Sequence, residues 1–152
     1  MYNEDLILAT LRRQAKAEAA TLQTRSADMT GTELYAEEDY IPDFLAACKK
    51  QNMLKRPIGF TCRSSAGRVV RLLQNYDSTI YTQEPEELPA QWGFKWSTDP
   101  AKARPFISIS TSPYNIGECC LNEAGEPKRS TIDGNVWSPD TNPEYWEDPG
   151  VA

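Results

Sequence analysis

The chain has 152 residues, with 22 acidic residues, 16 basic residues, no histidine and a formal net charge of −6. An acidic chain repels phosphate backbones, so we expect no nucleic-acid partner. Without histidine it lacks the commonest general base and metal ligand, so we expect no enzyme activity, cofactor or metal. No apolar run is long enough for a membrane span or a signal peptide, which predicts synthesis in the cytoplasm and no membrane contact.

The first predicted element is a helix over residues 3–26. Asn3 is a suitable N-cap for it. Leu8, Ala15 and Leu22 fall on one face and are seven residues apart, which is the spacing of a coiled-coil seam. Two interpretations stay open. The helix packs on its own domain, or it is a short oligomerisation helix.

A linker is predicted next, followed by a second helix. The stretch "SADMTGTELYAEEDYIP" has a glycine, an acidic run and Pro42, which favour a loop or an extended segment. "PDFLAACKKQNML" from Pro42 then predicts a short helix, since proline suits a first helical turn. Further on, residues 68–74 and 105–111 predict strands, because β-branched residues there lie between turn residues.

Two stretches of this second half follow one pattern. "IGFTCRSSAG" begins at Ile58 and "IGECCLNEAG" begins at Ile116, with glycine, cysteine and Ala-Gly at equal offsets. Each is followed by the spacing Pro-x-x-x-Pro-x-x-Trp, which ends at Trp92 in the first copy and at Trp146 in the second. We infer a tandem duplication of a unit of about 35 residues, below the size that usually folds alone.

Each unit predicts a small antiparallel β structure with its own core. Cys62 and Cys120 occupy equivalent positions and should face inward as small apolar residues. No CxxC pair is present, so a structural zinc site is not expected. With Cys48 and Cys119, the four cysteines are expected to be reduced, mostly buried thiols. Ala-Gly forms the turn to the second strand, and the final tryptophan closes the core.

The predicted fold class is therefore α+β, with a helical arm before two tandem β modules. The expected divisions are an N-terminal helical arm and linker over 1–54, a first antiparallel β module over 55–97 and a second over 98–152.

The second unit resembles a known family. Its closing run "WSPDTNPEYW" from Trp137, with Tyr114-x-x-Gly117 before it, is similar to small chitin-binding-type carbohydrate-binding modules, above all those of bacteriophage and prophage tail proteins. In those proteins a helical segment and an acidic linker often precede the module, and "TGTELYAEEDYIPDF" is similar to that linker. The first unit is less similar, since Gln83 stands in the position of Trp137 and Arg56 in that of Tyr114.

The resemblance implies a surface of aromatic side chains that stack on sugar rings. The candidates are Trp137, Tyr114 and Tyr145 in the second unit and Tyr76 and Tyr81 in the first, each of which could instead be a core residue. Trp92 and Trp146 are expected in the core, because the repeat keeps both as closing residues.

The resemblance also implies a virion structural protein of the tail, baseplate or fibre, with a surface glycan as its ligand. The arm would contact other virion proteins, and the chain would form a homo-oligomer, a trimer by analogy with phage fibres. The alternative function is a stand-alone, non-catalytic carbohydrate-binding protein.

Overall fold

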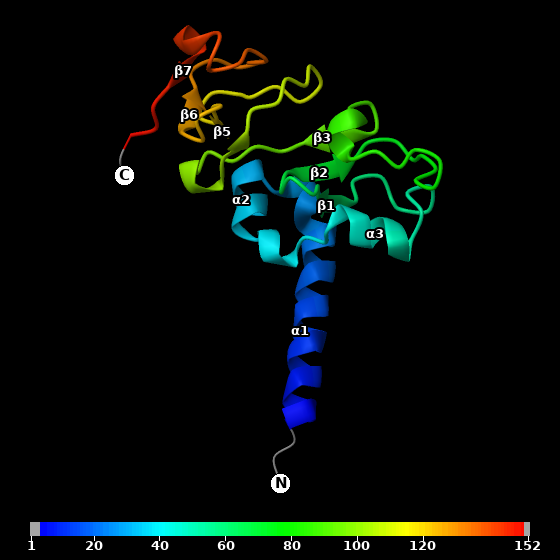
Figure 1. Cartoon of the computed structure of the whole chain (residues 1–152). Coiled ribbons are helices and arrows are strands. Elements are labelled where there is room, and N and C mark those ends of the chain that lie inside the picture. The colour runs from blue at the N-terminus through cyan, green and yellow to red at the C-terminus, as the bar shows by residue number, and fades with distance from the viewer. Residues whose placement is uncertain (1–3, 151–152) are drawn as a thin grey trace.

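The computed structural model describes residues 4–150 and has the predicted α+β composition (Figure 1). The expected N-cap, Asn3, lies outside the described residues. The helices and strands are α1 (Glu4–Arg25), α2 (Gly31–Ala36), α3 (Phe44–Lys50), β1 (Thr61–Arg63), β2 (Val69–Leu72), β3 (Trp92–Phe94), β4 (Arg104–Pro105), β5 (Cys119–Leu121), β6 (Pro127–Ser130) and β7 (Trp146–Glu147). Within this described part, no helix combines the length and the apolar character that a membrane crossing needs.

Helix α1 projects from the body as a stalk (Figure 1). Residues 5–18 are exposed, and Leu8 and Leu11 keep 48% and 55% of their surface in contact with solvent. Only the C-terminal end of the helix enters the body, through Leu22, which is 1% exposed. Leu22 is therefore not free to take part in the predicted seam. The helix packs on its own domain at its base and remains uncovered over the preceding turns.

The segment predicted as a linker is instead a helix, α2, flanked by 3₁₀ turns at Ser26–Asp28 and Glu38–Tyr40. A capping box forms this helix. The Glu33 amide donates to the Thr30 hydroxyl oxygen at 3.1 Å, and the Thr30 amide donates to the Glu33 carboxylate at 3.0 Å. The prediction of a loop was wrong. Thr30 and Glu33 accept hydrogen bonds from amides at the start of the helix, and this stabilises a helix of only six residues.

Helix α2 braces the chain between the two predicted modules. A Cβ atom on Gly31 would lie 2.0 Å from the carbonyl oxygen of Trp96, so only glycine permits this approach. The buried hydroxyl of Tyr35 donates to the carbonyl oxygen of Lys95 at 2.9 Å and accepts from the amide of Val69 at 3.1 Å. The segment that we expected to be a linker thus holds β2 and the chain after β3 in place.

The second predicted helix is confirmed as α3. It begins after the Asp43 N-cap, whose carboxylate accepts from the amide of Ala46 at 3.0 Å. Phe44 and Ala47 are buried against the first sheet, whereas Leu45 is 48% exposed.

The first sheet has the order β1-β2-β3 and is antiparallel throughout, which confirms a strand within residues 68–74. The second sheet has the order β4-β5-β6-β7, and β4 pairs with β5 in parallel. We had expected an antiparallel second module, and the parallel pair of β4 and β5 shows that this expectation was wrong for one edge of the sheet. The strand predicted over 105–111 is also reduced to Arg104–Pro105, because Phe106 and Ile109 turn into the core instead.

The two stretches of the repeated pattern follow the same backbone path. Gly59 and Gly117 have φ angles of 92° and 91°, and each donates its amide to the last residue of the second strand of its unit, at 2.8 and 3.0 Å. Gly67 and Gly125, with φ angles of 84° and 80°, close the turns between the paired strands. All four glycines occupy the left-handed region, which side chains disfavour, so the repeated glycines keep one chain path in both units.

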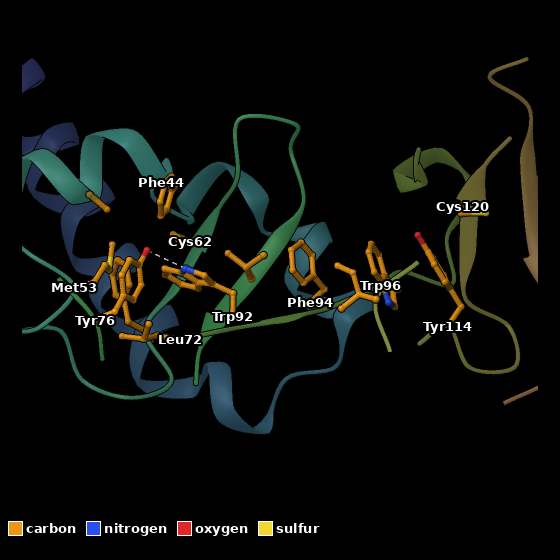
Figure 2. Packing of buried hydrophobic residues seen from close by; sticks show 14 of the residues in the cluster. Phe44, Met53, Cys62, Leu72, Tyr76, Trp92, Phe94, Trp96, Tyr114 and Cys120 are labelled. Carbon is orange, nitrogen blue, oxygen red and sulfur yellow. Dashed lines mark hydrogen bonds between the residues drawn. The ribbon is translucent and has the colours of Figure 1, made fainter. Parts of the chain in front are cut away.

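One buried cluster runs through both β units (Figure 2). It contains Cys62 and Trp92 of the first unit, both 0% exposed, and Cys120 and Trp146 of the second, at 0% and 7%. The inward positions predicted for these four residues are confirmed. The expectation of a separate core in each module was wrong, because the cluster is continuous between the two sheets.

A row of stacked rings makes this continuity (Figure 2). The ring centroids of Phe94 and Trp96 are 5.8 Å apart, and those of Trp96 and Tyr114 are 4.3 Å apart. A second cluster (Leu22, Met29, Leu34, Tyr35, Ile41 and Val69) joins α1 and α2 to β2.

Candidate functional site

The five aromatic residues predicted to bind a glycan lie in different environments. Trp137 and Tyr81 are 43% and 53% exposed, and Tyr145 is half-buried. Tyr114 and Tyr76 are 0% and 7% exposed. The structure brings Trp137 and Tyr145 together, with ring centroids 5.1 Å apart and ring planes tilted by 42°.

Tyr114 and Tyr76 are core residues and present no face to a ligand. The Tyr114 ring lies between those of Trp96 and Phe106, and burial raises the pKa of its hydroxyl well above the ordinary value. The Tyr76 hydroxyl accepts a hydrogen bond from the Trp92 indole at 3.0 Å (Figure 2), and burial raises its pKa to about 12. The prediction failed for both residues because each ring fills space beside a closing tryptophan or the row of stacked rings.

Tyr81 lies on the first unit, apart from the pair of Trp137 and Tyr145. It lines a cavity of about 270 Å³, together with Phe44, Leu45 and Cys48 of α3. Burial raises the pKa of the Cys48 thiol, which is half-buried there.

Backbone contacts of one buried side chain hold the pair of Trp137 and Tyr145. Asn135 is 0% exposed, and its carboxamide oxygen accepts from the amide of Trp137 at 3.1 Å. Its nitrogen donates to the carbonyl oxygen of Tyr145 at 3.2 Å and to the hydroxyl of Ser130 at 3.0 Å. The indole of Trp146 donates to the carbonyl oxygen of Trp137 at 2.8 Å. The exposed ring of Trp137 thus rests on a fixed backbone.

Polar side chains follow the pair along the same turns. The Asp140 amide donates to the Ser138 hydroxyl at 3.1 Å, and the Thr141 hydroxyl donates to the Asn142 carboxamide at 3.0 Å. Glu144 accepts from the Asn142 side chain at 3.4 Å. An exposed aromatic face beside hydroxyl, amide and carboxylate groups has the chemistry of a sugar-binding surface. Sequence reasoning missed Asn135, because its role depends on contacts across the loop that only the folded chain makes.

A search for groups of three or more His, Cys, Asp and Glu that could hold a metal found none among residues 4–150. Comparison with protein-family models, curated proteins and solved structures found no match for this chain. The resemblance to carbohydrate-binding modules therefore stays a prediction.

Proposed function

We propose that the protein is a non-enzymatic structural subunit of a bacteriophage virion, in the tail, the baseplate or a fibre. It attaches through α1 and holds its two β units away from the attachment point. The uncovered arm carries this proposal. Leu6, Ile7, Leu8 and Leu11 are 48–60% exposed on a helix that is anchored only at its base. Helices shorter than about 12–15 residues are marginal in water on their own, so a partner that covers these side chains would stabilise the arm.

The arm binds the arms of two further copies of the chain and forms a trimer, by analogy with the threefold symmetry of phage fibres. Leu8 and Ala15 keep the seven-residue spacing of a seam in the uncovered part. Other virion proteins would bind beyond this bundle.

Light scattering on the full chain tests self-association. Changing Leu8 and Leu11 together to Glu should convert an oligomer to a monomer, because charges would enter the exposed apolar surface of the arm. The matched control is Ile80→Glu, since Ile80 is 69% exposed on the body and should leave the mass unchanged. A monomeric wild-type chain would reject self-association, but an anchor for a different protein would survive it.

Mass spectrometry of purified particles tests the location. The chain should be present at a fixed ratio to the other structural proteins. Its absence from the particles would reject the virion proposal.

A second candidate, a stand-alone carbohydrate-binding protein, is favoured by the exposed pair of Trp137 and Tyr145. It predicts that the isolated chain binds a surface glycan and that Trp137→Ala loses this binding. The control Tyr81→Ala should keep it, because the exposed ring of Tyr81 lies on the first unit. A glycan array measures both. Equal loss in the two variants would mean that neither ring defines the site.

A further inference from the structure

A cleft between the two β units is lined by charged residues, and none of its lining residues belongs to α1 or to the pair of Trp137 and Tyr145. Its volume is about 330 Å³. The wall from the first unit carries Arg71 and Lys95, and the wall from the second carries Asn115 and Glu118. Leu73 and Pro113 add apolar surface. The volume is near the lower end of the usual range of about 300–1,000 Å³ for ligand pockets, so one small molecule or one sugar unit would fill it.

The unpartnered side chain of Arg71 is the observation that indicates a ligand. Its Nε atom is shielded from solvent without a hydrogen-bond partner, and its other nitrogens also make no hydrogen bond or ion pair within residues 4–150. The Nε atoms of Arg56 and Arg68 are also shielded without a partner. Arg56, however, donates through Nη2 to the carbonyl oxygen of Ala47 at 2.9 Å, and Arg68 pairs through Nη1 with Glu86 at 2.8 Å. Only Arg71 of the three therefore makes no hydrogen bond among residues 4–150. Shielded donors in folded proteins are nearly always satisfied, so the Arg71 guanidinium calls for an acceptor.

The other charges of the cleft do not supply that acceptor. Glu118 is half-buried, and its Oε1 atom already accepts from the Asn115 amide at 2.6 Å. Lys95 is also half-buried and forms no ion pair within the described residues. Burial is the main influence on the pKa of Glu118 and raises it, Lys95 lowers it, and the nearby Asp133 raises it. Arg71 is therefore the cation of the cleft whose charge has no partner among the described residues.

We propose that this cleft binds a carboxylate-bearing sugar unit. The sugar carboxylate pairs with Arg71, whose planar guanidinium suits bidentate recognition, and Lys95 adds a second positive charge. The sugar hydroxyls donate to Glu118, and the ring lies against Leu73 and Pro113. Inorganic phosphate fits less well, because it has no ring to lie against Leu73 and Pro113 and its higher charge is repelled by Glu118. This inference rests on the glycan-binding role proposed for the chain, but it names a sugar class and uses different residues.

Titration of the ¹⁵N-labelled full chain, followed by NMR, tests the proposal. The probes are D-glucuronate, D-glucose as its neutral counterpart and inorganic phosphate. Glucuronate should shift the Arg71 Nε–H signal and the cleft amides saturably. Glucose and phosphate should bind at least about tenfold more weakly, since a tenfold ratio corresponds to about 1.4 kcal/mol. Equal binding of phosphate and glucuronate, or no saturable shift with glucuronate, would overturn the proposal.

Two variants localise the effect. Arg71→Gln should weaken glucuronate binding by about tenfold or more, as expected for a lost charge-assisted pair. The matched control is Arg129→Gln, because Arg129 pairs across β5–β6 where Arg71 pairs across β1–β2, and it does not line the cleft. Equal loss in both variants would overturn the assignment. If Arg71→Gln fails to fold, the comparison of the three probes on the wild-type chain still decides.

A third variant separates this inference from the proposed function. Trp137→Ala should leave the glucuronate-induced shifts of the cleft unchanged while it removes binding at the aromatic pair. Loss of the cleft shifts in Trp137→Ala would place the sugar at the aromatic pair instead and overturn the cleft assignment.

Discussion

The two β units have the same chain path but different surroundings. The three helices gather around β1, β2 and β3, and the second sheet lies to one side of them (Figure 1). Phe60 is buried at 7% in the first unit, whereas Glu118 is half-buried at the equivalent place in the second. The repeated part is therefore the backbone and its turns. The side chains differ between the copies: Phe60 packs in the core, whereas Glu118 lines a cleft.

The closing tryptophans give the largest expected difference between the units. Trp92→Ala should cost about 3–5 kcal/mol, because it empties a fully buried aromatic site and leaves the Tyr76 hydroxyl without its donor. Trp146→Ala should fall at the lower end of that range, since Trp146 is 7% exposed. Chemical denaturation measures both. A larger loss for Trp146 would mean that the second unit carries more of the core than its burial indicates.

Gly31→Ala tests how much the first unit depends on helix α2 (Gly31–Ala36), the brace against β2 and the chain after β3. The new methyl group would meet the backbone of Trp96, so we expect a loss of about 1–3 kcal/mol, the usual cost of overpacking. Hydrogen exchange should show β2 amides losing protection before β6 amides. Gly150→Ala, which has open space around it, is the control and should be neutral. Equal loss of protection in both sheets would contradict the asymmetry.

The paired glycines test whether the chain paths are equivalent in energy as well as in shape. Gly59→Ala and Gly117→Ala should each cost about 1–2 kcal/mol, because both force a side chain into the left-handed region. Thermal or chemical denaturation should place the two values close together. Gly59 would be slightly the more costly, since its Cβ would lie 2.8 Å from Nη2 of Arg71, whose side chain would have to shift. A neutral result at one site would break the equivalence.

The paired cysteines should be replaced with little effect. Cys62→Val and Cys120→Val should each cost about 1 kcal/mol or less, because near-isosteric apolar swaps usually stay below about 1.5 kcal/mol. Denaturant midpoints provide the measurement. Collapse of either variant would show that the thiol contributes more than its volume.

Glu118→Gln gives the smallest expected effect, and its sign depends on pH. Burial is the main influence, and it raises the pKa of the Glu118 carboxyl above its ordinary value of 4.5. The folded state therefore binds protons more strongly than the unfolded state. Wild-type stability should fall as the pH rises from about 4.5 through the folded pKa. The glutamine of the variant does not titrate, so the stability of the variant should not fall in this way. The melting temperature of Glu118→Gln minus that of the wild type should therefore grow as the pH rises over the same interval. An advantage that shrinks as the pH rises would contradict the assignment.

Much of this fold could be predicted because its signals are local. The Pro-Asp start of α3 and the repeated glycines each describe a few neighbouring residues. The brace was missed although its signal was also local, because the Thr30–Glu33 capping box lay inside an acidic stretch that favoured a loop.

The candidate sites were harder to predict, because they depend on where distant segments meet. A tyrosine next to a turn has the same sequence signal whether it faces solvent, as Tyr81 does, or lies in a ring stack, as Tyr114 does. The cleft of Arg71 and Glu118 lies between two units that meet through distant contacts. The Trp96 ring stacks on Tyr114. Arg68 donates to the carbonyl oxygen of Pro105 at 2.7 Å, and Thr32 of α2 accepts from the amide of Thr98 at 2.9 Å. No spacing within either repeat contains that information.

If the uncovered arm docks as proposed, assembly is the last step of folding. A helix with no neighbour along most of its length frays, so in a lone subunit the N-terminal turns would be ordered for only part of the time. Docking would then fix the backbone and bury the leucines together, which gives association the heat-capacity change of coupled folding and binding. The same property offers a form of quality control, because proteases would cleave arms that have found no partner and spare those already in place.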